Sequence, residues 1–231
     1  MDPNITQSLL ANIVWHTLAG PQRRFAAGTT TARRYARGFS PIIAFAVASE
    51  PDFVALEPVC DIGEHFYCGG WSGPVPSGWS LDADTFACQM VWAGDAPAPD
   101  PDFVPVRLGP QHAAQMLDLV AIAPPGPFAG RTIELGEYYG VFDGDRLVAM
   151  AGERMEAGAL REISGVCTHP DYQGRGHARR LVETLVRRQL ARRQVPFLHV
   201  MHGNDNARRI YERAGFKRHS DMVVRVVTRT G

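Results

Sequence analysis

The sequence has few of the features that mark membrane, secreted or metal-binding proteins. No stretch of its 231 residues approaches the ~18 consecutive apolar residues that a membrane helix needs. The N-terminal segment lacks the basic start and unbroken apolar core of a signal peptide, so we expect a cytoplasmic protein without a membrane partner. Four cysteines, Cys60, Cys68, Cys88 and Cys167, are too few and too scattered for a disulfide framework. They also lack the paired spacing of zinc ligands, and we expect buried thiols and no metal.

Two common nucleotide-binding signatures are also missing. No Gly-Lys-Ser/Thr sequence is present, which excludes a P-loop. A second strand–helix–strand unit followed by an acidic residue is missing too, which argues against a dinucleotide-binding fold. The formal net charge is zero, yet residues 161–231 carry 15 Lys and Arg against 6 Asp and Glu. This basic third suits a polyanionic ligand, a nucleic acid or a solvated helix face.

A segment dense in Pro and Asp, residues 94–105, reads as a linker because it cannot hold a helix or an interior strand. It divides the chain into an N-terminal α/β part, 1–93, and a C-terminal part, 106–231. In the first part we expect a helix over 5–19. Strands are expected there over 41–48, 53–59, 65–68 and 85–92.

The second part has a more regular pattern. Asp143-Gly144 predicts a hairpin between two strand-like runs, and Asn204 and Gly215 predict the two ends of a helix. The expected order is a helix over 111–122, strands over 137–142, 146–154 and 160–168, a helix over 176–193, a strand over 197–201, a helix over 204–214 and a strand over 222–227. This order predicts an α/β (α+β) fold, with helices flanking a mostly antiparallel mixed sheet.

The junction between the strand ending at Thr168 and the following helix carries the chemistry. Gln173-Gly174-Arg175-Gly176-His177-Ala178 opens that helix, and a helix start presents unpaired N–H groups at an electropositive end. Two glycines let a ligand approach the backbone closely. The junction therefore predicts a pyrophosphate cradle, with a plain tight turn as the alternative.

These residues resemble the GNAT superfamily of acyl-CoA-dependent N-acyltransferases. The superfamily turn, Gln/Arg-x-x-Gly-x-Gly/Ala, is matched by Gln173, Gly176 and Ala178. Its downstream motif is matched by Asn204, Ala207, Ile210, Tyr211, Gly215 and Phe216. The resemblance covers about residues 103–231 and is greatest to the catalytic domain of glycine N-acyltransferase-type proteins. Those proteins carry a divergent GNAT-like half in front, and residues 1–93 are a candidate for such a half.

The resemblance implies an acyltransferase that uses acetyl-CoA or another acyl-CoA as co-substrate. The acyl group would pass directly to an amine in a ternary complex. The cofactor-binding residues would be Val166, Cys167 and Thr168, pairing with the pantetheine amides, and Gln173, Gly174, Arg175, Gly176, His177, Ala178 and Arg179, around the pyrophosphate. Tyr211 would contact the CoA sulfur and act as the acid, with a core tyrosine as the alternative.

Two further residues have assigned roles with open alternatives. Glu162 is the candidate general base, while an ion pair with Arg161 or Arg154, an exposed strand end, or a water serving as base remain alternatives. Asn204 would bond a cofactor amide, cap its helix, or do both.

The acceptor is expected to be a small-molecule or peptide amine. Residues 124–132 and the loop holding Trp71 and Trp79 are candidates to line its pocket, and a homodimer stays open. A non-catalytic CoA-binding sensor or scaffold is the alternative function. We expect no nucleic-acid partner, because helix 176–193 has neither interleaved aromatic residues nor a recognition motif.

Overall fold

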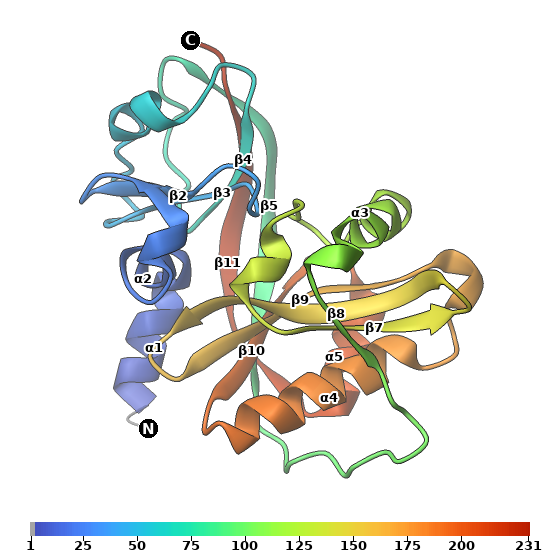
Figure 1. Cartoon of the computed structure of the whole chain (residues 1–231). Coiled ribbons are helices and arrows are strands. Elements are labelled where there is room, and N and C mark those ends of the chain that lie inside the picture. The colour runs from blue at the N-terminus through green and yellow to red at the C-terminus, as the bar shows by residue number, and fades with distance from the viewer. Residues whose placement is uncertain (1–2) are drawn as a thin grey trace.

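The computed structural model describes residues 3–231, which form a single curved sheet with helices on both faces (Figure 1). The helices are α1 (Pro3–Ala11), α2 (Ile13–Ala19), α3 (Ala113–Ile122), α4 (His177–Ala191) and α5 (Asp205–Ala214), with short 3-10 turns η1 (Arg23–Phe25), η2 (Val54–Val59), η3 (Pro110–His112), η4 (Thr132–Leu135) and η5 (Pro170–Tyr172). The strands are β1 (Ala26–Gly28), β2 (Ala32–Tyr35), β3 (Ile42–Phe45), β4 (His65–Gly69), β5 (Trp79–Trp92), β6 (Val106–Leu108), β7 (Tyr138–Asp143), β8 (Arg146–Ala157), β9 (Leu160–Thr168), β10 (Val195–Met201) and β11 (Phe216–Arg229). This mostly antiparallel sheet with flanking helices confirms the predicted fold class.

The sheet has 11 strands in the order β1-β2-β3-β4-β11-β5-β10-β9-β8-β7-β6. The pairs β3–β4 and β9–β10 are parallel, and the other neighbouring pairs are antiparallel. Strand β5 precedes the predicted linker, yet it lies between β10 and β11, which follow it. The sheet is therefore continuous across the predicted division at 94–105. The division of the chain into two domains stays a prediction.

The linker itself lies along α4. Arg180 of α4 is 2.7 Å from the Asp100 carboxylate, and its guanidinium stacks 4.5 Å from the Phe103 ring centroid. Arg187 donates a hydrogen bond to the Ala98 carbonyl at 3.1 Å. Part of the basic surface of α4 thus serves to hold this acidic segment.

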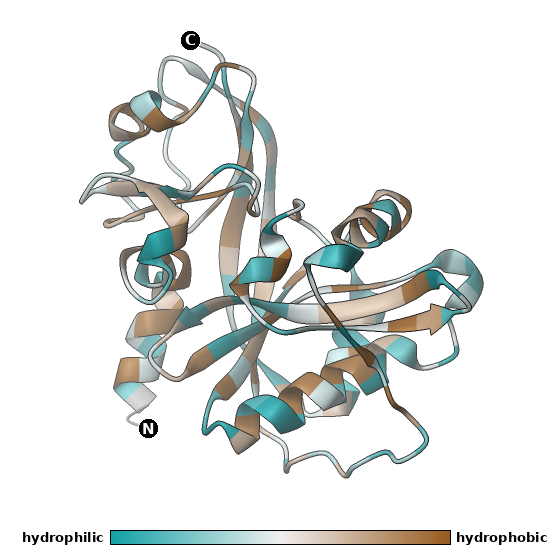
Figure 2. Ribbon diagram, viewed as in Figure 1, coloured by the Kyte–Doolittle hydropathy of each residue, from teal (hydrophilic) through white to brown (hydrophobic). Residues whose placement is uncertain are grey.

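Two layers cover the sheet, one on each face. On one face α4 and α5 pack on a core that includes Leu181, Leu185 and Ile163, while α1, α2 and α3 pack on the other. Figure 2 shows apolar residues along several strands and alternating with hydrophilic residues along α4, whose buried residues include Leu181 and Leu185. No helix in residues 3–231 has both the length and the apolar content to cross a bilayer.

The largest errors of the sequence prediction lie in the first 60 residues. The run over 53–59 is the 3-10 turn η2 with Pro58 inside it, so the predicted strand is wrong there. The helix expected over 5–19 is two helices, interrupted at Asn12, whose side chain donates to the Phe45 carbonyl at 2.9 Å. Strand β2 went unpredicted because its Arg33 and Arg34 are buried, although charged residues normally mark an exposed segment.

Candidate active site

The site begins where two parallel strands separate. Strands β9 and β10 pair only through Leu160 with Val195, Arg161 with Pro196, and Glu162 with Phe197. Beyond these pairs no ladder joins them, so the edge of β9 from residue 163 to residue 168 lacks a strand partner on the β10 side. This separation of the two strands is called the opening. The edge includes Val166, Cys167 and Thr168, as the sequence predicts, and an unpaired strand edge can receive an extended ligand.

A bulge in β9 lies beside this opening. Two residues, Gly165 and Val166, oppose a single residue of β8, and Gly165 has the left-handed φ of +63°. The bulge reverses the alternation of side chains along the strand. Val166 therefore packs with the α4 and α5 core, whereas Cys167 packs with the α3 core. Burial raises the pKa of the Cys167 thiol to about 12, which keeps it protonated and unreactive at neutral pH.

The predicted cradle lies at the end of β9. Gly174 and Gly176 have φ values of +76° and +79°, and a Cβ atom built on either one would meet nothing within 4 Å. The first amide of α4 with a backbone partner is that of Arg180, which donates to the Gly176 carbonyl at 3.1 Å. Within residues 3–231, no backbone acceptor takes the amides of residues 174–179. These free amides lie at a helix start, which is where proteins commonly bind a phosphate group.

Two buried polar atoms beside the cradle also lack a partner among the described residues. They are Oγ1 of Thr168 at the end of β9 and Nδ1 of His177 in the first turn of α4. Burial, together with the charges of Arg175 and Arg180, lowers the pKa of His177, so its imidazole is neutral at neutral pH. Unpartnered polar groups of this kind are costly in a folded protein unless a ligand satisfies them. The residues present therefore fit the diphosphate and pantetheine of a CoA molecule.

The three arginines near the cradle differ in how free they are. Arg175 stacks on Tyr172, with its guanidinium 4.6 Å from the ring centroid. Arg179 is 2.8 Å from Glu183, and Arg180 is committed to Asp100. Arg175 is thus the arginine beside the turn with no carboxylate partner within residues 3–231.

Tyr211 lies on α5, on the face of the sheet that carries α4. It is 8% exposed and packs in the same core as Val166. Burial, with a smaller contribution from Cys167, raises the pKa of its hydroxyl to about 12. Tyr211 is therefore protonated at neutral pH and can donate a hydrogen bond.

Glu162 is the last residue of β9 that pairs with β10, and its carboxylate is fully enclosed. Arg154 binds it through two hydrogen bonds of 2.9 and 2.8 Å, and Nδ1 of His199 is 2.9 Å from its Oε1 atom. Burial alone would raise the pKa of Glu162, but the charge of Arg154 and the hydrogen bonds from His199 and Arg154 hold it at about 2. The ion pair with Arg154, one of the alternatives from the sequence, is present.

The contacts of Glu162 extend across five neighbouring strands. From His199 the chain continues to Gln89, 3.1 Å from its Nε2 atom, and then to Ser220, which donates to the Gln89 side-chain oxygen at 3.2 Å. Arg154, Glu162, His199, Gln89 and Ser220 belong to β8, β9, β10, β5 and β11 respectively. This network holds the strands together at the point where β9 and β10 begin to separate. Apart from the pair of Arg154 and Glu162, this network was not predicted from the sequence, because its members are distant along the chain.

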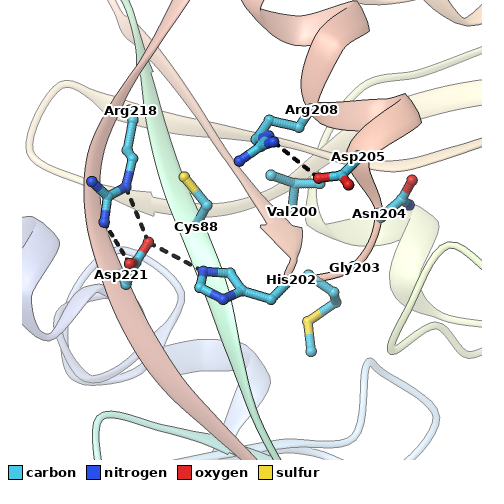
Figure 3. Close-up of a pocket in the computed structure, with 10 residues that line it drawn as sticks. Cys88, Val200, His202, Gly203, Asn204, Asp205, Arg208, Arg218 and Asp221 are labelled. Atoms are coloured by element: carbon cyan, nitrogen blue, oxygen red, sulfur yellow. Dashed lines mark hydrogen bonds and ion pairs between the residues drawn. The ribbon is translucent and has the colours of Figure 1, made fainter.

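Asn204 caps α5, accepting a hydrogen bond from the Ala207 amide at 3.1 Å. It also lines a pocket of about 260 Å³ between the end of β10, the start of α5 and strands β5 and β11 (Figure 3). The charged side chains in this pocket pair with one another: Arg218 and His202 with Asp221, and Arg208 with Asp205. No other predicted cofactor-binding residue lines it, so this pocket is separate from the cradle.

The predicted acceptor loops occupy different places. Phe128, within 124–132, packs on Tyr138 beside the β9 bulge, and Arg154 donates to the Pro127 carbonyl at 3.3 Å. By contrast, Trp71 and Trp79 are buried in a separate cluster with Phe53. Only the first loop lies next to the site.

Comparisons with known proteins identify the family. A family model described as FR47-like protein matches residues 138–226. The chain is also similar to the crystal structure of a GNAT-family protein from Novosphingobium aromaticivorans. The two are 32% identical, the match covers 96% of this chain and 99% of that one, and the TM-score is 0.85. This chain belongs to the GNAT family.

Other GNAT structures share the fold at lower identity. A GCN5-related N-acetyltransferase from Kribbella flavida has a TM-score of 0.60 at 14% identity, covering 96% of both chains. A GCN5-related N-acetyltransferase-like protein from Streptococcus suis has a TM-score of 0.60 at 15% identity, covering 93% of this chain and 92% of its own. Among curated protein sequences, none matches this chain. The GNAT assignment from the sequence is confirmed, while the closer resemblance to glycine N-acyltransferases stays a prediction.

Proposed function

We propose that this GNAT-family protein transfers an acetyl or other short acyl group from CoA to an amine acceptor, by direct attack in a ternary complex. The observation that carries the proposal is the set of free amides at residues 174–179, next to the opening between β9 and β10. The amides and Arg175 would hold the diphosphate, and the β9 edge at 166–168 would pair with the pantetheine. Gln173, His177, Ala178 and Arg179 complete the proposed binding turn, and Asn204 would approach from the start of α5.

Tyr211 is the proposed acid for the leaving thiolate. Its hydroxyl is protonated at neutral pH because burial raises its pKa to about 12. As the amine attacks, the bond from the acyl carbon to sulfur breaks and the sulfur gains negative charge. A hydrogen bond from Tyr211, followed by its proton, would stabilise that leaving group.

The attacking amine must also lose a proton to a general base. We propose that Glu162 contributes to this step. Its carboxylate is 1% exposed and bound to Arg154, so a direct contact with an acceptor is disfavoured. We therefore propose that Glu162 acts through His199, by holding the imidazole through its Nδ1 atom. The side-chain nitrogen of Gln89 lies 3.1 Å from Nε2 of the same ring, so both ring nitrogens have partners, and a water molecule would take the proton from the amine.

The acceptor class is proposed to be a small-molecule or peptide amine. The loop 124–132 covers the face of the sheet opposite α4, where Phe128 lies against the bulge. For α4 and its C-terminal cap we propose no nucleic-acid partner, because Arg180, Arg188 and the cap residue Arg192 are already paired with carboxylates.

Two measurements test the proposal on the intact chain. Titration calorimetry with CoA and acetyl-CoA measures binding, and a thiol-release assay with a panel of amines measures turnover. Binding with amine-dependent release of thiol supports an acyltransferase. CoA binding without thiol release in the presence of any amine would instead support the sensor or scaffold function. If the protein neither binds CoA nor releases thiol, the proposed site is wrong.

Variants at the cradle and at Tyr211 separate binding from chemistry. Gly176→Glu places a carboxylate among the free amides and should weaken CoA binding by roughly 100-fold or more, equivalent to about 2.7 kcal/mol. Gly144→Glu, at an exposed left-handed glycine in the β7–β8 turn, is the matched control and should bind CoA normally.

Tyr211→Phe should lower kcat by about 10²-fold with CoA binding intact. Unchanged turnover in Tyr211→Phe would contradict its role as the acid.

A further inference from the structure

The hydroxyl of Tyr138 is buried and has no hydrogen-bond partner among the described residues. Tyr138 is the first residue of β7, its side chain is 1% exposed, and it lies on the sheet face opposite α4. A buried hydroxyl without a partner loses its hydration and gains nothing in return. A phenylalanine would fill the same space without that loss, so packing alone does not account for a tyrosine here.

Two glycines create the space that this ring occupies. Gly152 is directly opposite Tyr138 in the β7–β8 pair, and a Cβ atom on Gly152 would lie 2.2 Å from the ring. A Cβ atom on Gly165, the bulge residue of β9, would lie 3.0 Å from the ring and 3.4 Å from its hydroxyl oxygen. The ring therefore crosses β8, and its hydroxyl ends at the β9 bulge.

Tyr138 and Tyr211 approach the same part of β9 from opposite faces. Tyr138 packs in the α3 core together with Cys167, and Tyr211 packs in the core beneath α4 and α5. In Figure 1, α3 and α5 lie on opposite sides of β9. Burial raises the pKa of both hydroxyls, and Cys167 is among the smaller contributors in each case. Both groups are thus hydrogen-bond donors at neutral pH, close to the edge at which the thioester would lie.

We propose that the Tyr138 hydroxyl donates a hydrogen bond to the carbonyl oxygen of the acyl group during transfer. The inference rests on the proposed acyltransferase function and adds a catalytic residue to it. When the amine nitrogen forms its bond to the acyl carbon, the π electron pair of the carbonyl moves onto the oxygen. That pair returns as the carbon–sulfur bond breaks, giving an amide and, after proton transfers, the free thiol of CoA. A donor fixed in a dry environment stabilises the oxygen most when its charge is greatest.

Tyr138→Phe removes the hydroxyl and keeps the ring. The expected result is a fall in kcat of about 10²-fold, the size typical of losing one oxyanion donor, with the KM for the amine and the Kd for CoA unchanged. The melting temperature should stay the same or rise, because the variant removes an unsatisfied buried group. A hydroxyl that only stabilises the fold would give the opposite result for the melting temperature.

Tyr139→Phe is the matched control. Tyr139 is the next residue on β7, but it lies on the other face of the sheet, beneath the Arg188 guanidinium. Its variant should retain wild-type kcat. An unchanged kcat in Tyr138→Phe, a raised amine KM at constant kcat, or a loss of turnover matched by a lower melting temperature would each overturn the proposal. Wild-type protein that releases no thiol with any amine would overturn the acyltransferase function as well, so the two failures are distinguishable.

Discussion

Among single residues, the buried pair of Arg154 and Glu162 has the most constrained surroundings. Each side chain is less than a tenth exposed, and the carboxylate also accepts a hydrogen bond from the Met155 amide at 3.3 Å. Taking one member away leaves the other as an uncompensated buried charge, which is among the largest penalties that a substitution can cause. Glu162 therefore contributes to stability, whatever its part in the chemistry.

Glu162→Gln tests this and carries a pH dependence. At pH 7 the variant should lower the free energy of unfolding by about 3–5 kcal/mol, measured by urea denaturation. The folded-state pKa of Glu162, about 2, lies below its ordinary value of 4.5, so the charge stabilises the fold fully above pH 4.5. That contribution is lost as the pH falls from 4.5 through 2, and the stabilities of wild type and variant should converge there.

The exposed pair of Arg131 and Glu134 provides the control. Its side chains are 52% and 38% exposed, so Glu134→Gln should cost less than about 1 kcal/mol. Equal losses in the two variants would contradict the burial argument. If the free energies of unfolding of wild type and Glu162→Gln instead differ by a constant amount down to pH 2, the fold does not lower the pKa of the Glu162 carboxyl.

At the scale of elements, the bulge in β9 decides how the site is assembled. It changes which face Val166 and Cys167 occupy, and it places Gly165 against Tyr138. The network from Arg154 to Ser220 holds the strands just before this point. The point at which β9 separates from β10 thus lies between the paired residues 160–162 and the bulge at 165–166.

Gly165→Ala is expected to lower both stability and turnover. Its φ of +63° disfavours a side chain, and the added Cβ atom would contact the Tyr138 ring. Gly144→Ala is the control, because Gly144 has a similar φ of +56° and open space around it. Both variants should lose about 1 kcal/mol from backbone strain, measured by chemical denaturation. Only Gly165→Ala should also lower kcat, and equal kcat values would show that the Tyr138 contact is unimportant.

At the scale of the whole molecule, strand β5 joins the two parts of the chain. It pairs with β10 from Phe197 to Met201 and with β11 from Phe216 to Arg229. Without β5, both of these strands would have an unpaired edge and Leu198 and Val200 would lose part of their core. Strand β5, which lies within the first 93 residues, is therefore an integral part of the sheet that carries the site.

Two fragments, residues 1–93 and 106–231, test this dependence. The C-terminal fragment alone is expected to be unfolded or aggregated, because exposed strand edges pair with other chains. Co-expression with 1–93 should restore a folded complex, detected by co-purification and by a cooperative thermal transition. A C-terminal fragment that folds and binds CoA alone would support the predicted division into independent domains.

Local sequence determined a large part of this protein. The Gly-rich turn, the Asn204 cap and the strand 160–168 follow from chemistry within a few residues, and the structure has the cap and the strand where they were expected. The role of the turn as a cofactor cradle stays a proposal. Periodicity failed where a short segment was shaped by distant partners, as for β2, whose buried Arg34 pairs with Glu64.

Only tertiary structure decided the rest. The insertion of β5 between β10 and β11, the enclosure of Glu162, and the meeting of Tyr138 with Gly152 and Gly165 join residues that are far apart along the chain. Local propensity is set by a residue and its near neighbours, so it cannot specify such contacts. Burial and strand pairing specify them, because those free energies exist only once the whole sheet has formed.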